Sequence, residues 1–280
     1  MRVLIVRHGE SENNLMTDSL AARGLAGDAY QQELLRLHQS DPPLTAKGRQ
    51  EAQQLADFYA PIFAESGRRC HVFTSPFLRC CETTQPLASR LGASAEVTRH
   101  PDLHENGGVH AVVELPDGKL AFDDRPLRSR GPPGARGHAG KCMSAADIQS
   151  RFPGYGTRML PPEGQWYVEG SETAAQSAER AARVATWLKH DQDLHDDIGD
   201  DAVMVLIMHG GFIDSLLKAL LHAGGGPGAA AAVSSEHAAS FDFPNTATAS
   251  LNISRGGSVA VGWIGSTSHL NPGAYERAML

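Results

Sequence analysis

The sequence predicts an α/β fold of three layers (α/β/α), in which helices cover both faces of a mostly parallel central sheet. Three short runs, at residues 3–6, 70–76 and 202–208, have the composition of strands buried inside a parallel sheet. The segments between them place apolar residues at helical spacing. Strands that alternate with helices in this way form βαβ units, whose strands run parallel.

The first half of the chain alternates regularly. After the first strand, residues 15–41 favour a loop with some helix. The sequence Pro-Leu-Thr at 43–45 marks the start of an amphipathic helix, whose apolar positions recur through 48–63. A second helix is expected over 76–92, where Gly92 ends it, and residues 95–108 supply a short strand and a loop at the strand end.

The second half is less regular. Residues 107–140 are rich in Gly and Pro and show neither a strand nor a helix period, so we interpret them as an insertion or lid. The other expected elements are a weak helix over 144–152, a long helix from Ser171 or Glu172 to about 190, an acidic loop over 190–201, a helix over 212–222, a Gly/Ala connector over 224–232 and a closing strand pair over 247–254 and 258–264.

Length and composition limit the function classes. A chain of 280 residues with 41% hydrophobic content is expected to form a single domain, 1–280, with the insertion or lid at about 107–140. A net charge of -7 gives no overall basic field for nucleic acid or an anionic membrane surface. The first strand begins at residue 2, no segment has the length of a membrane span, and the four cysteines lack disulfide or metal spacing. We therefore expect a cytoplasmic protein with reduced thiols.

Two of the buried strands end on histidine followed by glycine. His8 follows the first strand, and His209 follows the strand at 202–208. In open α/β sheets the carboxyl ends of the strands border the ligand site. The helix that follows His209 offers free N–H groups at its N-terminus, and Arg7 and Arg79 add guanidinium donors at neighbouring strand ends. This edge of the sheet is therefore expected to bind an anion, of which phosphate is the obvious example.

The motifs at these positions resemble the histidine phosphatase superfamily, in its phosphoglycerate mutase-like branch. They are RHGES at 7–11, TSPFLRCCETT at 74–84, LHENGG at 103–108 and MHGGF at 208–212, accompanied by PLTAKG at 43–48, Asn245-Thr246 and a closing SHL at 268–270. The order and spacing of these motifs match over nearly the whole chain. The resemblance implies a phosphoglycerate mutase-like fold and phosphoryl transfer through a phosphohistidine.

The resemblance also implies a role for each matching residue. His8 would be the nucleophile, and Arg7, Arg79 and His209 would hold the phosphoryl oxygens. Glu105 would protonate the leaving alkoxide and then deprotonate the attacking water. The remaining phosphate-binding candidates are the side chain of Asn14 and the backbone N–H groups of Gly210 and Gly211.

Glu105 has two alternatives. It is followed by Asn-Gly-Gly, whereas cofactor-dependent mutases of this family follow their acid with an arginine and a tyrosine-glycine pair. This departure argues against a mutase. If the loop is threaded differently, Asp102 or Glu114 would replace Glu105.

No metal and no other cofactor is expected, because guanidinium groups supply the positive charge that magnesium supplies in other phosphoryl transferases. His100 and His104 flank Pro101 in a loop, which spoils a helical ligand pair. His190 and His195 are interpreted as part of a solvated acidic loop.

Three functions fit the motifs. The first is a cytoplasmic phosphomonoesterase that acts on a small phosphorylated metabolite through His8. The second is a phosphoglycerate mutase, which differs only in whether water or a substrate hydroxyl accepts the phosphoryl group. The third is a phosphate-binding regulatory protein without turnover, and the complete residue set argues against it. The substrate and the oligomeric state do not follow from the sequence.

Overall fold

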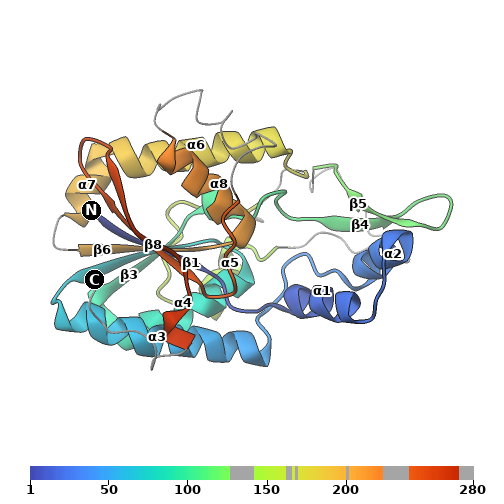
Figure 1. Ribbon diagram of the computed structural model, residues 1–280, viewed down its shortest axis with the longest axis horizontal. Helices are drawn as coiled ribbons and strands as arrows, with labels where there is room; N and C mark the ends of the chain where they lie inside the picture. Colours follow the sequence, from blue (N-terminus) through green and yellow to red (C-terminus); the bar gives the residue numbers. More distant parts are fainter. Residues whose placement is uncertain (127–141, 162–165, 168–169, 200–201, 223–239, 271–280) are drawn as a thin grey trace.

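The computed structural model describes residues 1–126, 142–161, 166–167, 170–199, 202–222 and 240–270. Its main sheet has six strands in the order β3-β2-β6-β1-β7-β8 (Figure 1). β1 pairs with β6 in parallel, as do β2 with β6 and β2 with β3, whereas β7 and β8 are antiparallel. The strands are β1 (Arg2–Arg7), β2 (Arg69–Thr74), β3 (Ala95–Arg99), β6 (Ala202–Met208), β7 (Thr248–Ile253) and β8 (Val259–Ser266).

Helices cover both faces of this sheet (Figure 1). Leu4 and Val6 point to a core shared with α3 (Ala46–Glu65), α4 (Leu78–Leu91) and α5 (Ala145–Arg151). Val3 and Ile5 point to the opposite core, shared with α6 (Ala174–His190), α7 (Gln192–Ile198) and α8 (Gly210–Leu221). Successive strand residues face opposite sides, so an uninterrupted apolar strand serves two cores. The expected three-layer α/β fold with a mostly parallel sheet is confirmed.

A lobe projects beyond the carboxyl ends of the parallel strands (Figure 1). It consists of α1 (Glu12–Ala22), α2 (Gly27–Leu37) and the two-stranded hairpin of β4 (Ala111–Glu114) and β5 (Leu120–Asp123). The Gln32 side chain joins α2 to the hairpin, since its Nε2 donates to the Leu120 carbonyl at 3.0 Å and its Oε1 accepts from the Leu120 N–H at 2.8 Å. The segments 15–41 and 107–126 thus meet in one unit.

The structure differs from the sequence expectations at four segments. Residues 15–41 form two helices, residues 107–126 contain the hairpin, residues 192–198 of the expected acidic loop are helical, and the long helix begins at Ala174. Thr173 caps that helix, because its side chain accepts from the Gln176 N–H while the Gln176 side chain returns to the Thr173 N–H. The 127–140 part of the insertion and the connector at 224–232 lie outside the described residues.

The hairpin turns at Gly118, whose φ of +81° is in the region that favours glycine. The Asp117 side chain accepts from the Lys119 N–H at 3.0 Å, and the Leu115 N–H donates to the Lys119 carbonyl at 2.7 Å. Asp-Gly is a strong hairpin signal that the Gly/Pro-rich sequence after it obscured.

Three short 3₁₀ turns complete the described elements: Gly92–Ser94, Pro101–Leu103 and Ser268–Leu270. All four cysteines are buried, and none is in a disulfide. Within the described ranges no helix is long and apolar enough to cross a membrane. The cytoplasmic location stays a prediction.

Candidate active site

Sheet register brings the two strand-end histidines together. Arg7 of β1 lies opposite Met208 of β6, so His8 and His209 leave the sheet side by side. Their ring centroids are 5.2 Å apart, and both side chains are buried. Thr74 of β2 lies opposite Ile207, which places the following turn and the start of α4 at the same edge.

Arg79, in the first turn of α4, lies between the two imidazoles. Its Nε donates to His8 Nε2 at 3.2 Å, and its Nη2 lies 3.0 Å from His209 Nδ1. The guanidinium carbon lies 4.2 Å from the centroid of the Phe77 ring, a cation–π contact. Arg79 therefore places several N–H donors in a buried position between the two imidazoles.

These contacts fix the tautomer of each histidine. An arginine only donates, so His8 Nε2 and His209 Nδ1 carry lone pairs. His8 Nδ1 accordingly donates to the Gly9 carbonyl at 2.7 Å, and His209 Nε2 donates to Ser75 Oγ at 2.8 Å. Burial, followed by the Arg79 charge, lowers the pKa of both histidines well below the usual value. His8 is therefore a neutral imidazole whose Nε2 lone pair faces the arginine.

Arg7 contributes a second guanidinium. Its Nη1 donates to the Phe243 carbonyl at 2.5 Å, and its Nε is buried without an acceptor in the part of the chain described. Gly210 lies against it, since a Cβ built there would be 3.3 Å from Arg7 Nε. Burial is the largest effect on Arg7 and lowers its pKa, although a guanidinium remains charged. An unpaired buried donor is costly, and an anion would satisfy it.

The loop after His8 is held by the first turn of α3. Glu10 accepts from Thr45 Oγ1 at 2.7 Å and from Lys47 Nζ at 2.6 Å, and its N–H donates to Glu51 at 2.8 Å. A Cβ on Gly48 would come within 2.0 Å of the Glu10 carbonyl oxygen, so the two backbones touch there. The segment PLTAKG therefore buttresses the nucleophile loop.

Asn14 lies near this loop from its position in the first turn of α1. Its Oδ1 accepts from the N–H and Oγ of Ser11 at 3.1 and 2.9 Å and from Asn245 Nδ2 at 3.3 Å. These three donors orient the amide so that its NH₂ group has no acceptor among the described residues. Asn245 also donates to the His8 carbonyl at 3.1 Å, which links the loop before β7 to the nucleophile.

Glu105 reaches the same edge of the sheet on the loop after β3. Its Oε1 accepts from the N–H groups of Asn106 and Phe212, each at 2.9 Å. The second oxygen, Oε2, has no hydrogen-bond donor in the described residues. Gly211 makes room for the carboxylate, because a Cβ there would lie 2.8 Å from Oε1. One oxygen is thus anchored at the N-terminus of α8, and the other is available to a substrate.

The backbone N–H groups of Gly210 and Gly211 open α8 and meet no acceptor in the described part of the chain.

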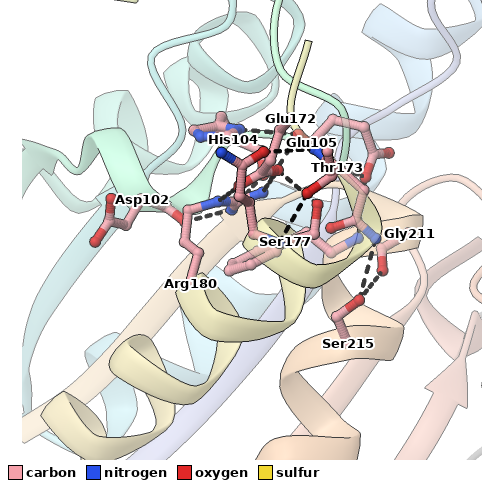
Figure 2. A network of polar contacts seen from close by, with 12 residues as sticks. Asp102, His104, Glu105, Glu172, Thr173, Ser177, Arg180, Gly211 and Ser215 are labelled. Carbon is pink, nitrogen blue, oxygen red and sulfur yellow. Dashed lines mark hydrogen bonds and ion pairs between the residues drawn. The ribbon is translucent and has the colours of Figure 1, made fainter. Parts of the chain in front are cut away.

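Of the two alternatives to Glu105, Asp102 points away from Gly211 in Figure 2 and lies 4.0 Å from the exposed Arg183. Glu114 lines a cavity of about 470 Å³ in the lobe, between α2 and the hairpin. The structure brings Glu105, rather than either alternative, to α8.

His100, His104 and His195 have structural contacts. His100 Nδ1 accepts from the Asp102 N–H at 3.2 Å, and His104 Nδ1 donates to the Glu105 carbonyl at 2.8 Å. His195 is buried within α7, where its Nε2 donates to the Leu188 carbonyl at 3.1 Å, which corrects the expectation of a solvated loop. Among the described residues no group of three or more His, Cys, Asp and Glu side chains could hold a metal.

Sequence reasoning missed three residues that support this site. Ser75 orients His209, as described above. Asp41 caps α4 by accepting from the Leu78 N–H at 2.8 Å, and burial raises the pKa of this carboxyl to about 6. Arg180 of α6 contacts the loop that carries Glu105. Asp41 and Arg180 lie outside the motifs, and Ser75 lies within TSPFLRCCETT, where sequence reasoning assigned it no role. The one signal that could have found Arg180 is its place among the apolar positions of an amphipathic helix.

The chain is similar to two phosphatases of known structure. The structure of ecdysone phosphate phosphatase from Bombix mori, in complex with tungstate, superimposes with a TM-score of 0.52 at 17% identity, over 94% of this chain and 92% of that chain. A mycobacterial glucosyl-3-phosphoglycerate phosphatase with VO3 gives a TM-score of 0.47 at 18% identity, over 95% and 99% of the two chains. A search of curated proteins finds no relative by sequence.

The first of these likenesses shows that the chain has the fold of the phosphoglycerate mutase-like phosphatases. The family model "Histidine phosphatase superfamily (branch 1)" matches residues 3–134, a range that includes His8, Arg79 and Glu105. These residues make the part of the chain from 3 to 134 similar to the histidine phosphatase superfamily.

Proposed function

We propose that this protein is a phosphomonoesterase that hydrolyses a small phosphorylated metabolite through a phosphohistidine at His8. The observation that carries the proposal is the convergence, in one buried place, of two guanidinium groups with a neutral imidazole whose Nε2 carries its lone pair and faces Arg79. Such a point binds a phosphate dianion and offers it a nucleophile without a change of tautomer.

In the first step the phosphate binds between Arg7, Arg79 and His209, whose N–H groups meet its oxygens. His8 Nε2 forms a bond to phosphorus while the bond from phosphorus to the substrate oxygen breaks. Protonated Glu105 gives its proton to that oxygen, and the alcohol leaves. The bound dianion offsets the effects that lower the pKa of His209. This imidazole therefore takes a proton from solvent on Nδ1 when phosphate binds, donates to phosphate, and returns the proton to solvent when phosphate leaves.

In the second step a water molecule attacks the phosphohistidine. Glu105, now a carboxylate, takes a proton from the water as the new bond to phosphorus forms. The bond between phosphorus and His8 Nε2 breaks, which releases inorganic phosphate and restores the neutral imidazole. Glu105 thus ends the cycle protonated, as it began. Its unbonded Oε2 supports this double role.

We also propose that residues 1–280 form one domain in which the lobe and the 107–140 segment select the leaving group. The hairpin and α2 lie beyond the strand ends that carry the histidines, where the rest of a substrate would extend (Figure 1). Loops and additions around a rigid site commonly determine specificity.

Assays with p-nitrophenyl phosphate and, separately, 3-phosphoglycerate test the function. Release of inorganic phosphate supports the phosphatase, and protein quenched during turnover should carry acid-labile phosphate. Isomerisation of 3-phosphoglycerate would instead identify a mutase. Phosphate binding without either reaction would identify a regulatory protein without turnover.

A further inference from the structure

Arg180 is a buried charge in α6 that the reaction described above does not use. It has 2% of its surface exposed. Its Nη1 donates to the carbonyls of Asp102 at 2.8 Å and His104 at 2.9 Å, and its Nη2 lies 3.5 Å from the Glu105 carbonyl (Figure 2). Three carbonyls of the loop that carries the candidate acid thus converge on one side chain.

Glu172 holds the other side of the same guanidinium. Arg180 Nε donates to Glu172 Oε1 at 2.8 Å, and Nη2 donates to Oε2 at 2.6 Å, as the dashed lines in Figure 2 show. Ser177 Oγ also donates to Oε2, at 2.6 Å, and the Glu172 N–H donates to the Gly107 carbonyl at 3.0 Å. The ion pair therefore contacts the backbone both before and after Glu105.

Burying this ion pair in the core costs free energy. Two charges removed from water lose their hydration, and apolar residues of similar volume often stabilise such a position equally well. All five N–H groups of Arg180 face an acceptor, which is the planar fork geometry that lysine does not reproduce. The contacts suit the fixing of a backbone path better than they suit core stability.

The same arginine also touches the other partner of Glu105. Its guanidinium carbon lies 4.0 Å from the centroid of the Phe212 ring, and the Phe212 N–H is the donor that anchors Glu105 Oε1. Asn106 ties the loop to α8 as well, because its Nδ2 donates to Ser215 Oγ at 3.1 Å. Loop, helix N-terminus and carboxylate are therefore one hydrogen-bonded unit centred on Arg180.

We propose that Arg180, held by Glu172, is the positioning residue for the acid–base carboxyl of Glu105: it fixes the loop so that Oε2 faces the leaving oxygen. This inference rests on the proposed function, in which Glu105 is the acid. A carboxyl displaced by about 1 Å loses on the order of 10²-fold in rate. The loss appears only where the leaving group needs a proton.

The test is Arg180→Lys, which keeps a positive charge opposite Glu172 but cannot hold both that carboxylate and the carbonyls of Asp102 and His104. We expect kcat/KM to fall about 10- to 100-fold for an alkyl phosphate and less than about 3-fold for p-nitrophenyl phosphate, whose leaving group scarcely needs protonation. Glu172→Gln, which keeps the shape of the acceptor, should show the same selective loss to a smaller extent.

Arg183→Lys is the matched control, since this arginine lies one turn further along α6 with 60% of its side chain exposed. Arg183→Lys should leave kcat/KM unchanged for both substrates. Thermal unfolding shows how much folded enzyme each variant contains. If Arg180→Lys does not fold, Glu172→Gln carries the measurement.

The double variant Arg180→Lys/Glu105→Gln separates this inference from the function on which it rests. If Arg180 acts through Glu105, the lysine causes no further selective loss once Glu105 is glutamine. Equal losses on both substrates in Arg180→Lys, or additive losses in the double variant, would overturn the positioning role and leave the phosphatase standing. A Glu105→Gln variant with unchanged substrate preference would overturn the acid assignment and the positioning role together.

Discussion

The carboxyl ends of the strands and the lobe beyond them are built by different interactions. At the strand ends, His8, Arg79 and His209 are buried and joined to one another by hydrogen bonds. In the lobe the ion pair of Lys119 with Asp28 is exposed, with 57% and 92% of the two side chains accessible. Exposed ion pairs contribute little to the free energy of unfolding, whereas loss of one partner of a buried charge is strongly destabilising.

The lobe also exposes large apolar side chains, at Leu15, Leu37, Leu115 and Phe122. These exposed apolar side chains can change without leaving a buried charge unpaired. The difference suggests a division of roles between the two regions. The strand ends hold one set of side chains rigidly for the phosphoryl group, and the lobe adapts to the rest of the substrate. Four predictions test this division.

The largest effect is expected for His8→Ala. Loss of the nucleophile should lower kcat by on the order of 10⁶-fold, as removal of a catalytic nucleophile does in other enzymes, and should abolish acid-labile phosphate on the protein. His100→Ala, which removes another buried histidine at a neighbouring strand end, is the control and should retain phosphorylation. An active His8→Ala enzyme would remove the chemistry from the strand ends altogether.

Arg79→Lys should lower kcat/KM by about 10²- to 10³-fold on every phosphomonoester, because a lysine cannot donate along both directions that the guanidinium now takes toward His8 and His209. Unlike the variants of Glu105 and Arg180, it should not discriminate between alkyl and aryl phosphates. Arg90→Lys, at the exposed end of the same helix, is the control. A strong dependence on the leaving group would show that Arg79 serves the leaving oxygen instead.

The strand ends were predictable from sequence, because parallel register carries any residue after β1 and β6 to the same edge. This is why His8 and His209 meet although 200 residues separate them. Arg79 followed by the same reasoning, since it lies in the first turn after β2. The family resemblance then supplied roles that strand position alone does not give.

The supporting contacts were not predictable, because they join residues far apart without a local period. Arg180 reaches Asp102 across 78 positions, and Asp41 reaches Leu78 across 37. The lobe was missed for a different reason. In α1 only Leu20 is buried, so its apolar pattern is too weak to show a helical face, and β4 and β5 have four residues each.

Acid should unfold the protein through the strand-end region. Burial lowers the pKa of several histidines. Five of them have large shifts: the pKa falls to about 4 for His100, His104 and His269 and well below the usual value for His8 and His209. The unfolded chain binds protons at these positions below pH 6.5 whereas the folded chain does not, so the free energy of unfolding falls as pH falls from 6.5 toward 4. Each histidine contributes up to about 1.4 kcal/mol per pH unit.

Asp41 acts in the opposite direction, because its raised pKa of about 6 lets the folded state bind a proton first. Protonation of this one carboxyl does not cancel the effect of the five histidines on the free energy of unfolding. Urea unfolding between about pH 6.5 and 4.5 should therefore show a falling midpoint, and His269→Gln should reduce the slope by about one proton. A midpoint that does not change over this range would show that these histidines are protonated in the folded protein.

The smallest effect is expected in the lobe. Replacement of a long part of the 107–140 segment would remove β5, so a point change between α2 and the hairpin is a cleaner test. Gln32→Ala removes both hydrogen bonds to Leu120, each with a net contribution of about 1 kcal/mol. A loosened lobe should raise KM several-fold for the best alkyl phosphate found in a panel of phosphometabolites, with little change in kcat. Turnover of p-nitrophenyl phosphate should stay within about 2-fold, since a small aryl ester depends on the strand ends alone.

Gln53→Ala on α3, which removes an exposed hydrogen bond to Asp57, is the matched control and should change neither substrate. Equal losses on both substrates would mean that the lobe shapes the phosphate site itself, and the division between the two regions would fail.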